Sequence, residues 1–221
     1  MKKFIITGTG RSGTGYIATL LTSLGVHCGH ENVFRPDTIH NDIEFGPYSG
    51  DASWLAAPFI SQLTNNMLVF HQVRNPIAVA RSFIGIGFFN DHPTADHMPY
   101  LRFLNDVGGF QHLESLEERF MFHWVHWNQY VEEQVKYAGL SYQRYRLEDV
   151  TPEMIRHMIL LPLGLEYDES LIRKAQEKIG TKTNRRTRNL AISNQTLKQY
   201  PMYAQFESLA NEYGYDLDKL S

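Results

Sequence analysis

The chain has 221 residues, of which 43% are apolar and 20% charged, values that are typical of a globular protein and exclude a disordered one. With 21 basic against 24 acidic residues the formal net charge is -3, so the composition gives no reason to expect nucleic acid or a membrane surface as a partner. The single cysteine, Cys28, excludes an intrachain disulfide and a zinc site built from cysteines. The first apolar run is too short for a signal peptide, and no run approaches the roughly 20 residues of a membrane span. We therefore expect a cytoplasmic protein that forms one domain over residues 1–221.

The N-terminal part alternates short apolar runs with segments of helical spacing. Phe4–Thr7 is a β-prone run ended by Gly8, as in a strand that is buried on both faces of a parallel sheet. The pattern predicts, in order, a strand at 4–7, a helix at 16–24, a short strand at 26–28, a loop at 29–53, a helix at 56–63, a strand at 67–73 and a helix at 76–83.

The C-terminal part opens with residues 85–112, which are rich in glycine and proline. We expect this segment to be irregular and to serve as a substrate or lid insertion, since long loops in compact domains are usually functional. The pattern then predicts a long helix at 113–137, a strand at 140–147, a helix that begins at Thr151-Pro152, and an amphipathic helix at 168–179. This alternation predicts an α/β fold of the P-loop NTPase-like kind, with a central parallel sheet flanked by helices on both faces.

Residues 8–15, Gly-Thr-Gly-Arg-Ser-Gly-Thr-Gly, lie between a predicted strand and a predicted helix. Small residues there let backbone N–H groups approach an anion, and the helix N-terminus adds positive potential. An ATP or GTP P-loop needs Lys and then Ser or Thr after its last glycine, whereas this chain has Thr14 and Gly15. A dinucleotide fingerprint is met formally by Gly8, Gly10 and Gly13, which leaves an NAD(P)-binding Rossmann-type oxidoreductase as an alternative.

A second group of anion-binding residues follows the next predicted central strand. Arg74 stands at the strand end, an Asn-Pro turn follows it, and Ser82 lies about two helical turns further on. An arginine fork and a hydroxyl together hold one face of a phosphate. Two anion sites at strand ends of one sheet predict a ligand with phosphate groups at both ends.

These motifs resemble those of sulfotransferases that use 3′-phosphoadenosine-5′-phosphosulfate (PAPS), in the style of tyrosylprotein-type and bacterial members. The resemblance covers mainly residues 1–84, where Arg11-Ser12-Gly13-Thr14 matches the family's loop. It implies that the 5′-phosphosulfate is held by Gly10, Arg11, Ser12, Gly13, Thr14 and Gly15, with Arg11 also neutralising charge during transfer. It implies further that Arg74 and Ser82 hold the 3′-phosphate, and that no metal is required.

The resemblance also implies a catalytic base. Cys28-Gly29-His30-Glu31 is similar to a segment of tyrosylprotein-type members in which the glutamate takes the acceptor's proton, so Glu31 is our first candidate and His30 the alternative. Weaker similarities lie at Trp127-Asn128 and at Arg146-Leu147-Glu148-Asp149-Val150, where Leu147 replaces the family's tyrosine. The cations Lys182, Arg185, Arg186 and Arg188 form either a flap over the nucleotide or a solvated face.

The function expected from these motifs is transfer of a sulfuryl group from PAPS to a hydroxyl, with PAP (3′,5′-ADP) as product. Residues 85–112 contain several aromatic side chains and a single basic one, Arg102, which suits a carbohydrate or small molecule better than an acidic tyrosyl peptide. Asp91, His92 and His97 lack the fixed spacing of a metal site. A non-catalytic nucleotide-binding module is a further alternative, and the oligomeric state is left open.

Overall fold

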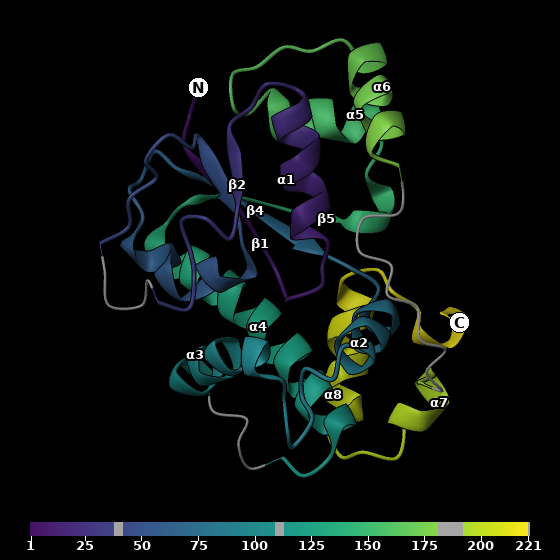
Figure 1. The fold of residues 1–221 in the computed structure, drawn as a ribbon. Helices are drawn as coiled ribbons and strands as arrows, with labels where there is room; N and C mark the ends of the chain where they lie inside the picture. The colour runs from purple at the N-terminus through teal and green to yellow at the C-terminus, as the bar shows by residue number, and fades with distance from the viewer. Residues whose placement is uncertain (38–41, 109–112, 181–191, 221) are drawn as a thin grey trace.

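The computed structural model describes residues 1–37, 42–108, 113–180 and 192–220. At its centre lies a five-stranded sheet with the strand order β2-β3-β1-β4-β5 (Figure 1). The strands are β1 (Phe4–Thr7), β2 (Cys28–His30), β3 (Gly50–Ala52), β4 (Leu68–Val73) and β5 (Ser141–Arg146). Every neighbouring pair is parallel, which confirms the α/β class with a central parallel sheet.

The two central strands, β1 and β4, are apolar because helices cover both faces of the sheet. Every residue of these strands is buried. Successive side chains of a strand point to opposite faces. Phe4 and Ile6 therefore join Phe70 in the core on one face, while Ile5 joins its register partner Val69 in the core on the other.

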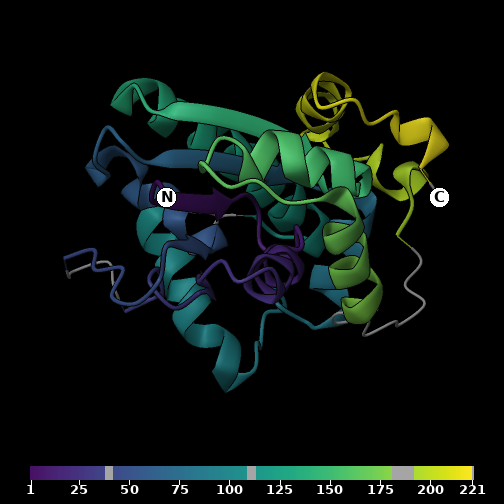
Figure 2. The ribbon, with the colours of Figure 1, turned by 90° about the horizontal axis from the view of Figure 1, so that it is seen from above.

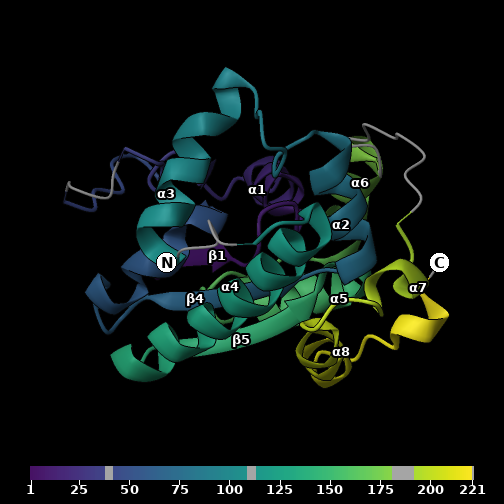
Figure 3. The same ribbon diagram turned by 90° about the horizontal axis from the view of Figure 1, so that it is seen from below.

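Two helical layers enclose the sheet, and Figure 1 shows one above it and one below. The upper layer, viewed from above in Figure 2, contains α1 (Thr14–Ser23), α5 (Pro152–Met154), the π-helical segment Ile155–Leu160 and α6 (Glu169–Ile179). The lower layer, viewed from below in Figure 3, contains the 3₁₀ segment Trp54–Gln62, α2 (Pro76–Gly85), α3 (Met98–Gly108), α4 (Leu116–Ala138), α7 (Asn194–Leu197) and α8 (Tyr203–Glu212). Short 3₁₀ turns lie at Ala95–His97, Leu147–Asp149 and Leu217–Lys219.

Helix starts follow the capping signals of the sequence. The Asn75 side chain accepts a hydrogen bond from the Ala78 N–H at 3.1 Å, and Thr151 accepts one from the Met154 N–H at the same distance. Proline occupies the first turn of both helices, where it has no backbone N–H to leave unpaired. These caps confirm the predicted starts of α2 and α5.

Three expectations for residues 26–63 were wrong. The segment 29–53 is not one long loop, because it contains β3, and β2 covers Cys28–His30 rather than 26–28. The expected helix at 56–63 is a 3₁₀ segment that starts at Trp54. The strand β3 has no apolar run: it consists of a glycine that packs against Phe4, the buried acid Asp51, and an alanine. This segment forms a strand because it is buried and paired between β1 and β2.

The expectation that residues 85–112 are irregular was also wrong, because α3 occupies Met98–Gly108. Its proline, Pro99, lies in the first turn, where a helix tolerates it, and Phe103 and Leu104 face the core. The helices α7 and α8 were not predicted. The cations Lys182, Arg185, Arg186 and Arg188 lie outside the described residues. Over the described part of the chain, no helix combines the length and the apolar character that crossing a membrane requires.

Candidate active site

The glycine-rich loop lies between β1 and α1 and is held in place by contacts with Gln72 of β4. Arg11 has a φ of 67° and Gly13 a φ of 100°, so the backbone turns through the left-handed region twice. Gly8 has no room for a side chain, since a Cβ there would lie 2.1 Å from the Gln72 carbonyl oxygen. The Gln72 side chain donates to the Ser12 carbonyl at 2.8 Å and accepts from the Tyr145 hydroxyl at 2.7 Å. Sequence reasoning missed Gln72, which was read only as part of an apolar strand.

The start of α1 combines several features that suit an anion. No side chain caps it among the described residues, and its first turn contains no acidic residue. The Ser12 hydroxyl in the same loop is fully buried and has no hydrogen-bond partner within the described chain. Uncapped N–H groups, a helix dipole and an unpaired hydroxyl form a cradle for an anion.

The two predicted phosphate sites adjoin each other. The Arg11 side chain donates from Nε to the Ser82 hydroxyl at 2.8 Å, and Arg74 donates from Nη1 to the Arg11 carbonyl oxygen at 2.9 Å. Arg11 comes from the loop after β1, and Arg74 from the end of β4, its neighbour in the sheet. The structure therefore brings both arginines and Ser82 into one cluster at the carboxyl edge of the sheet.

The segment after β5 completes this edge. Glu148 accepts hydrogen bonds from the Asn75 N–H at 2.9 Å and from the Tyr215 hydroxyl at 2.8 Å. Burial lowers the pKa of Arg74, and the charge of Glu148 opposes that shift. Leu147 covers the loop so closely that a Cβ on Gly13 would lie 2.7 Å from it. The segment 146–150, a weak similarity in the sequence, thus lies beside both predicted anion sites.

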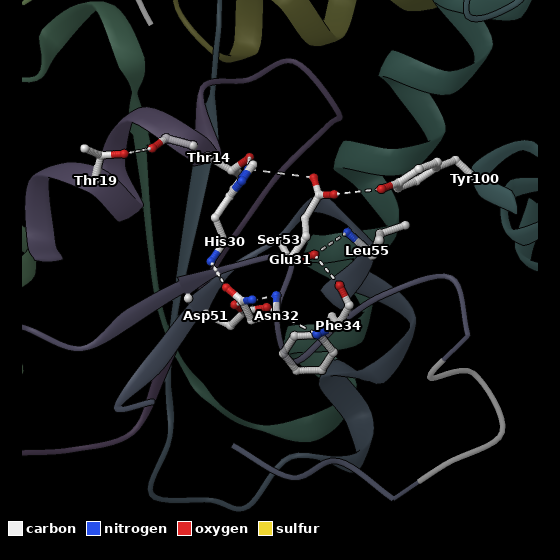
Figure 4. Close-up of polar contacts among 12 residues, drawn as sticks. Thr14, Thr19, His30, Glu31, Asn32, Phe34, Asp51, Ser53, Leu55 and Tyr100 are labelled. Carbon is white, nitrogen blue, oxygen red and sulfur yellow. Dashed lines mark hydrogen bonds and ion pairs between the residues drawn. The ribbon is translucent and has the colours of Figure 1, made fainter. Parts of the chain in front are cut away.

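Glu31 follows β2 directly and has a φ of 55°, which is uncommon for a residue with a side chain. Its Oε2 accepts a hydrogen bond from the Tyr100 hydroxyl at 3.4 Å, and its Oε1 lies 3.8 Å from His30 Nε2 (Figure 4). Burial raises the pKa of the Glu31 carboxyl, while hydrogen bonds from Tyr100 and Trp54 and the charge of Arg11 lower it. A partly desolvated carboxylate near a cationic loop has the character of a general base.

His30 lies against the start of α1. Its Nε2 is 3.3 Å from the Thr14 hydroxyl, and its ring occupies space beside Gly15, where a Cβ would lie 3.3 Å from the imidazole. Burial lowers the pKa of His30, with the charge of Asp51 raising it and that of Arg11 lowering it. Both candidate bases thus lie close to the anion cradle.

A buried carboxylate fixes the turn that carries these two residues. Asp51 on β3 accepts hydrogen bonds from three successive backbone N–H groups, those of Asn32, Val33 and Phe34, at 3.2, 3.3 and 3.2 Å (Figure 4). A Cβ on Gly29 would lie 2.3 Å from Asp51 Oδ1. Sequence reasoning missed Asp51 because it lay in an expected loop. Its neighbours Gly50 and Ala52 do not form an apolar run that would predict a buried strand.

Other residues singled out in the sequence serve packing. Trp127 donates from its indole to the Trp54 carbonyl at 3.0 Å, and Asn128 is buried with its Oδ1 2.8 Å from His71 Nε2. Within the described ranges, no group of three or more His, Cys, Asp and Glu side chains is placed to hold a metal ion.

The chain has a clear likeness among solved structures. No family model matches the chain, and no curated protein matches its sequence. Among solved structures, the chain is similar to a sulfotransferase domain from the curacin biosynthetic pathway, with a TM-score of 0.61 and 15% sequence identity over 98% of each chain. At this identity the likeness establishes a sulfotransferase-like fold over the full length.

Proposed function

We propose that this chain transfers a sulfuryl group from PAPS to a neutral hydroxyl acceptor and releases PAP. The observation that carries the proposal is the cluster in which Arg11 bonds to Ser82 while Arg74 bonds to the Arg11 backbone. Two cations of neighbouring strand ends, next to an uncapped helix N-terminus, suit a donor with a phosphosulfate at one end and a phosphate at the other.

The donor would lie along the carboxyl edge of the sheet. The backbone from Gly10 to Gly15, with the Ser12 and Thr14 hydroxyls, would receive the phosphosulfate at the start of α1. Arg74 and Ser82 would hold the 3′-phosphate, with the Glu148 carboxylate keeping Asn75, the residue after Arg74, in place. Fixing both ends of the donor orients its sulfur for attack from one direction.

The transfer step balances without a further reactant. The acceptor oxygen attacks sulfur, the bond from sulfur to the bridging phosphate oxygen breaks, and PAP leaves with the electron pair. Glu31 takes the acceptor's proton, and Arg11 with the loop N–H groups offsets the negative charge that moves to the leaving phosphate. His30 is the alternative base, since its Nε2 also lies beside Thr14.

The proposed acceptor is a carbohydrate or a small molecule. Tyr100 of α3 lies against Glu31, so residues of the 85–112 segment border the position of an acceptor hydroxyl. This segment offers one cation, Arg102, and several aromatic side chains. Such a surface favours a sugar ring or a hydroxylated metabolite over an acidic peptide.

The alternative of an NAD(P)-dependent oxidoreductase fits less well. In the dinucleotide-binding fold the acid that holds the ribose ends a strand adjacent to β1. Here β3 lies between β1 and β2, so Glu31 follows a strand that is one place further out. A non-catalytic nucleotide-binding module would keep both anion sites and have no use for the partly buried carboxylate of Glu31.

Calorimetry with PAP, 5′-AMP, NAD, NADP and ATP, each with and without a chelator, tests the donor. We expect PAP to bind far more tightly than 5′-AMP, and Arg74→Ala to remove about 1.5–3 kcal/mol of that difference. Equal affinity for PAP and 5′-AMP, or a magnesium requirement with ATP preferred, would contradict the proposal. A screen with labelled PAPS over glycans, phenols and tyrosine peptides then tests the acceptor.

A further inference from the structure

The two oxygens of the Glu31 carboxylate have different surroundings. Oε2 accepts the hydroxyl of Tyr100 from α3 at 3.4 Å, whereas Oε1 lies on the side of His30 Nε2, at 3.8 Å. His30 in turn contacts the Thr14 hydroxyl at the start of α1 (Figure 4). Oε2 is thus engaged by Tyr100 of the lower helical layer, and Oε1 lies on the side of His30 and the glycine-rich loop, while the Trp54 side chain also hydrogen-bonds to this carboxyl.

The phenol that engages Oε2 is itself held firmly. The Tyr100 ring stacks on Trp54, with the ring centroids 6.1 Å apart and an angle of 26° between the rings. Trp54 is 5% exposed, packs edge-to-face on Phe103, and its carbonyl accepts the indole N–H of Trp127 at 3.0 Å. The position of the Tyr100 hydroxyl is therefore set by packing between α3, α4 and the 3₁₀ segment, and not by Glu31 alone.

We propose that Tyr100 is a positioning residue: from α3 it holds Oε2 of Glu31 and thereby presents Oε1 to an acceptor hydroxyl at the glycine-rich loop. This inference rests on the proposed function for its catalytic consequence, but the geometry of the carboxylate does not depend on it. The position of α3 would then matter for catalysis, since a displacement of that helix would change both the orientation and the basicity of Glu31.

Hydrogen bonding to the charged form of a carboxyl favours that form. The charged and titratable groups that face Glu31 are Tyr100 from α3, His30 from β2 and Arg11 from the loop. The Tyr100 bond lowers the pKa of Glu31 against the raising effect of burial. Its removal should therefore raise the pKa of Glu31 and leave fewer molecules with an active base at a given pH.

The variant Tyr100→Phe tests this directly, because it keeps the ring on Trp54 and removes only the hydroxyl. In carbon NMR of protein labelled at the glutamate carboxyls, with Glu31→Gln identifying the signal, the pKa of Glu31 should be higher in Tyr100→Phe than in the native protein. Once an acceptor is known, kcat at a pH near the native Glu31 pKa should fall about three- to tenfold, and the acid limb of the kcat profile should move to higher pH. The affinity for PAP should stay within about twofold of the native value.

Tyr130→Phe is the matched control. Tyr130 belongs to the same aromatic group, with its ring centroid 6.2 Å from that of Trp127, and makes no hydrogen bond to Glu31 within the described residues. It should leave the pKa of Glu31 unchanged. In the reciprocal direction, Glu31→Gln should lower the pKa of the Tyr100 hydroxyl, which burial and the Glu31 charge raise in the native protein.

The outcomes separate this inference from the proposed function. An unchanged Glu31 pKa in Tyr100→Phe, or an equal shift in Tyr130→Phe, overturns the role of Tyr100 whatever the activity. A shifted Glu31 pKa in a protein that does not use PAPS supports the positioning role and contradicts the proposed function instead.

Discussion

The Arg11 guanidinium donates a hydrogen bond to the Ser82 hydroxyl at 2.8 Å across a sequence separation of 71 residues. This bond joins the glycine-rich loop after β1 to the helix that follows β4. Because Arg11 is also bonded through its carbonyl to Arg74, one residue links the two proposed anion sites through both its side chain and its backbone. Ser82 thus positions Arg11 in addition to its proposed contact with the 3′-phosphate.

Ser82→Ala should weaken PAP binding by about three- to tenfold, because a typical hydrogen bond contributes roughly 0.5–1.5 kcal/mol net. Isothermal calorimetry measures the effect. Ser61→Ala, at an exposed serine of the 3₁₀ segment, is the control and should leave the affinity unchanged. Equal PAP affinity in Ser82→Ala and the native protein would remove Ser82 from the donor site.

The choice between Glu31 and His30 is testable by substitution. Glu31→Gln keeps the size and removes the basicity, so turnover should fall about 10²–10⁴-fold with PAP affinity within about twofold. In the native protein, turnover should rise with pH through the Glu31 pKa, which burial raises above its ordinary value. His30→Ala should cost less, and abolition of turnover by His30→Ala with little effect of Glu31→Gln would reverse the assignment.

The sequence predicted the parts of the fold in which local pattern and tertiary environment agree. The apolar runs of β1 and β4, the cap at Thr151, and the glycine-rich turn between β1 and α1 are of this kind. Both proposed phosphate motifs could be placed at one edge of the sheet, because each follows a buried strand and the carboxyl ends of adjacent parallel strands meet there. The contact between Arg11 and Ser82 could not be found, because it depends on which strands are neighbours.

The residues that the sequence did not reveal act through tertiary contacts. Asp51 is part of a segment that reads as a loop in the sequence. In the fold, β3 lies between β1 and β2, and the buried Asp51 carboxylate accepts hydrogen bonds from the backbone at 32–34. Gln72 lies within an apolar strand, yet its side chain reaches the loop. Tyr100 belongs to α3, a helix that the sequence did not predict because its segment is rich in glycine and proline. In each case the partner is distant in sequence, so no pattern of residue spacing along the chain could predict the pair.

The turn that carries Glu31 leaves no space at Gly29. A Cβ there would lie 2.3 Å from the Asp51 carboxylate, so Gly29→Ala should lower the free energy of unfolding by about 1–3 kcal/mol, as overpacking does. Gly108→Ala is the matched control, since a Cβ at the end of α3 meets nothing within 4 Å. Chemical denaturation of both variants measures the difference, and equal stabilities would show that the turn can move away from Asp51.

A buried histidine of α4 makes the fold sensitive to acid. His123 is 3% exposed, packs against Trp54, Phe83, Phe89 and Trp127, and its Nε2 has no hydrogen-bond partner within the described residues. Burial lowers the pKa of His123 to about 3. In the unfolded chain this ring takes up a proton near its ordinary pKa of about 6.5, so folding is opposed progressively as the pH falls below that value.

His123→Phe should therefore reduce the loss of stability between pH 6.5 and pH 3. One pKa unit corresponds to about 1.4 kcal/mol, so His123 accounts for up to a few kcal/mol of the acid sensitivity. Near neutral pH the variant should be as stable as the native protein or more so, because an unpaired buried nitrogen is replaced by an apolar ring among aromatic neighbours. Urea unfolding at several pH values gives both quantities. The same slope of stability against pH in both proteins would mean that His123 is protonated in the folded state, through water or a rearrangement of α4.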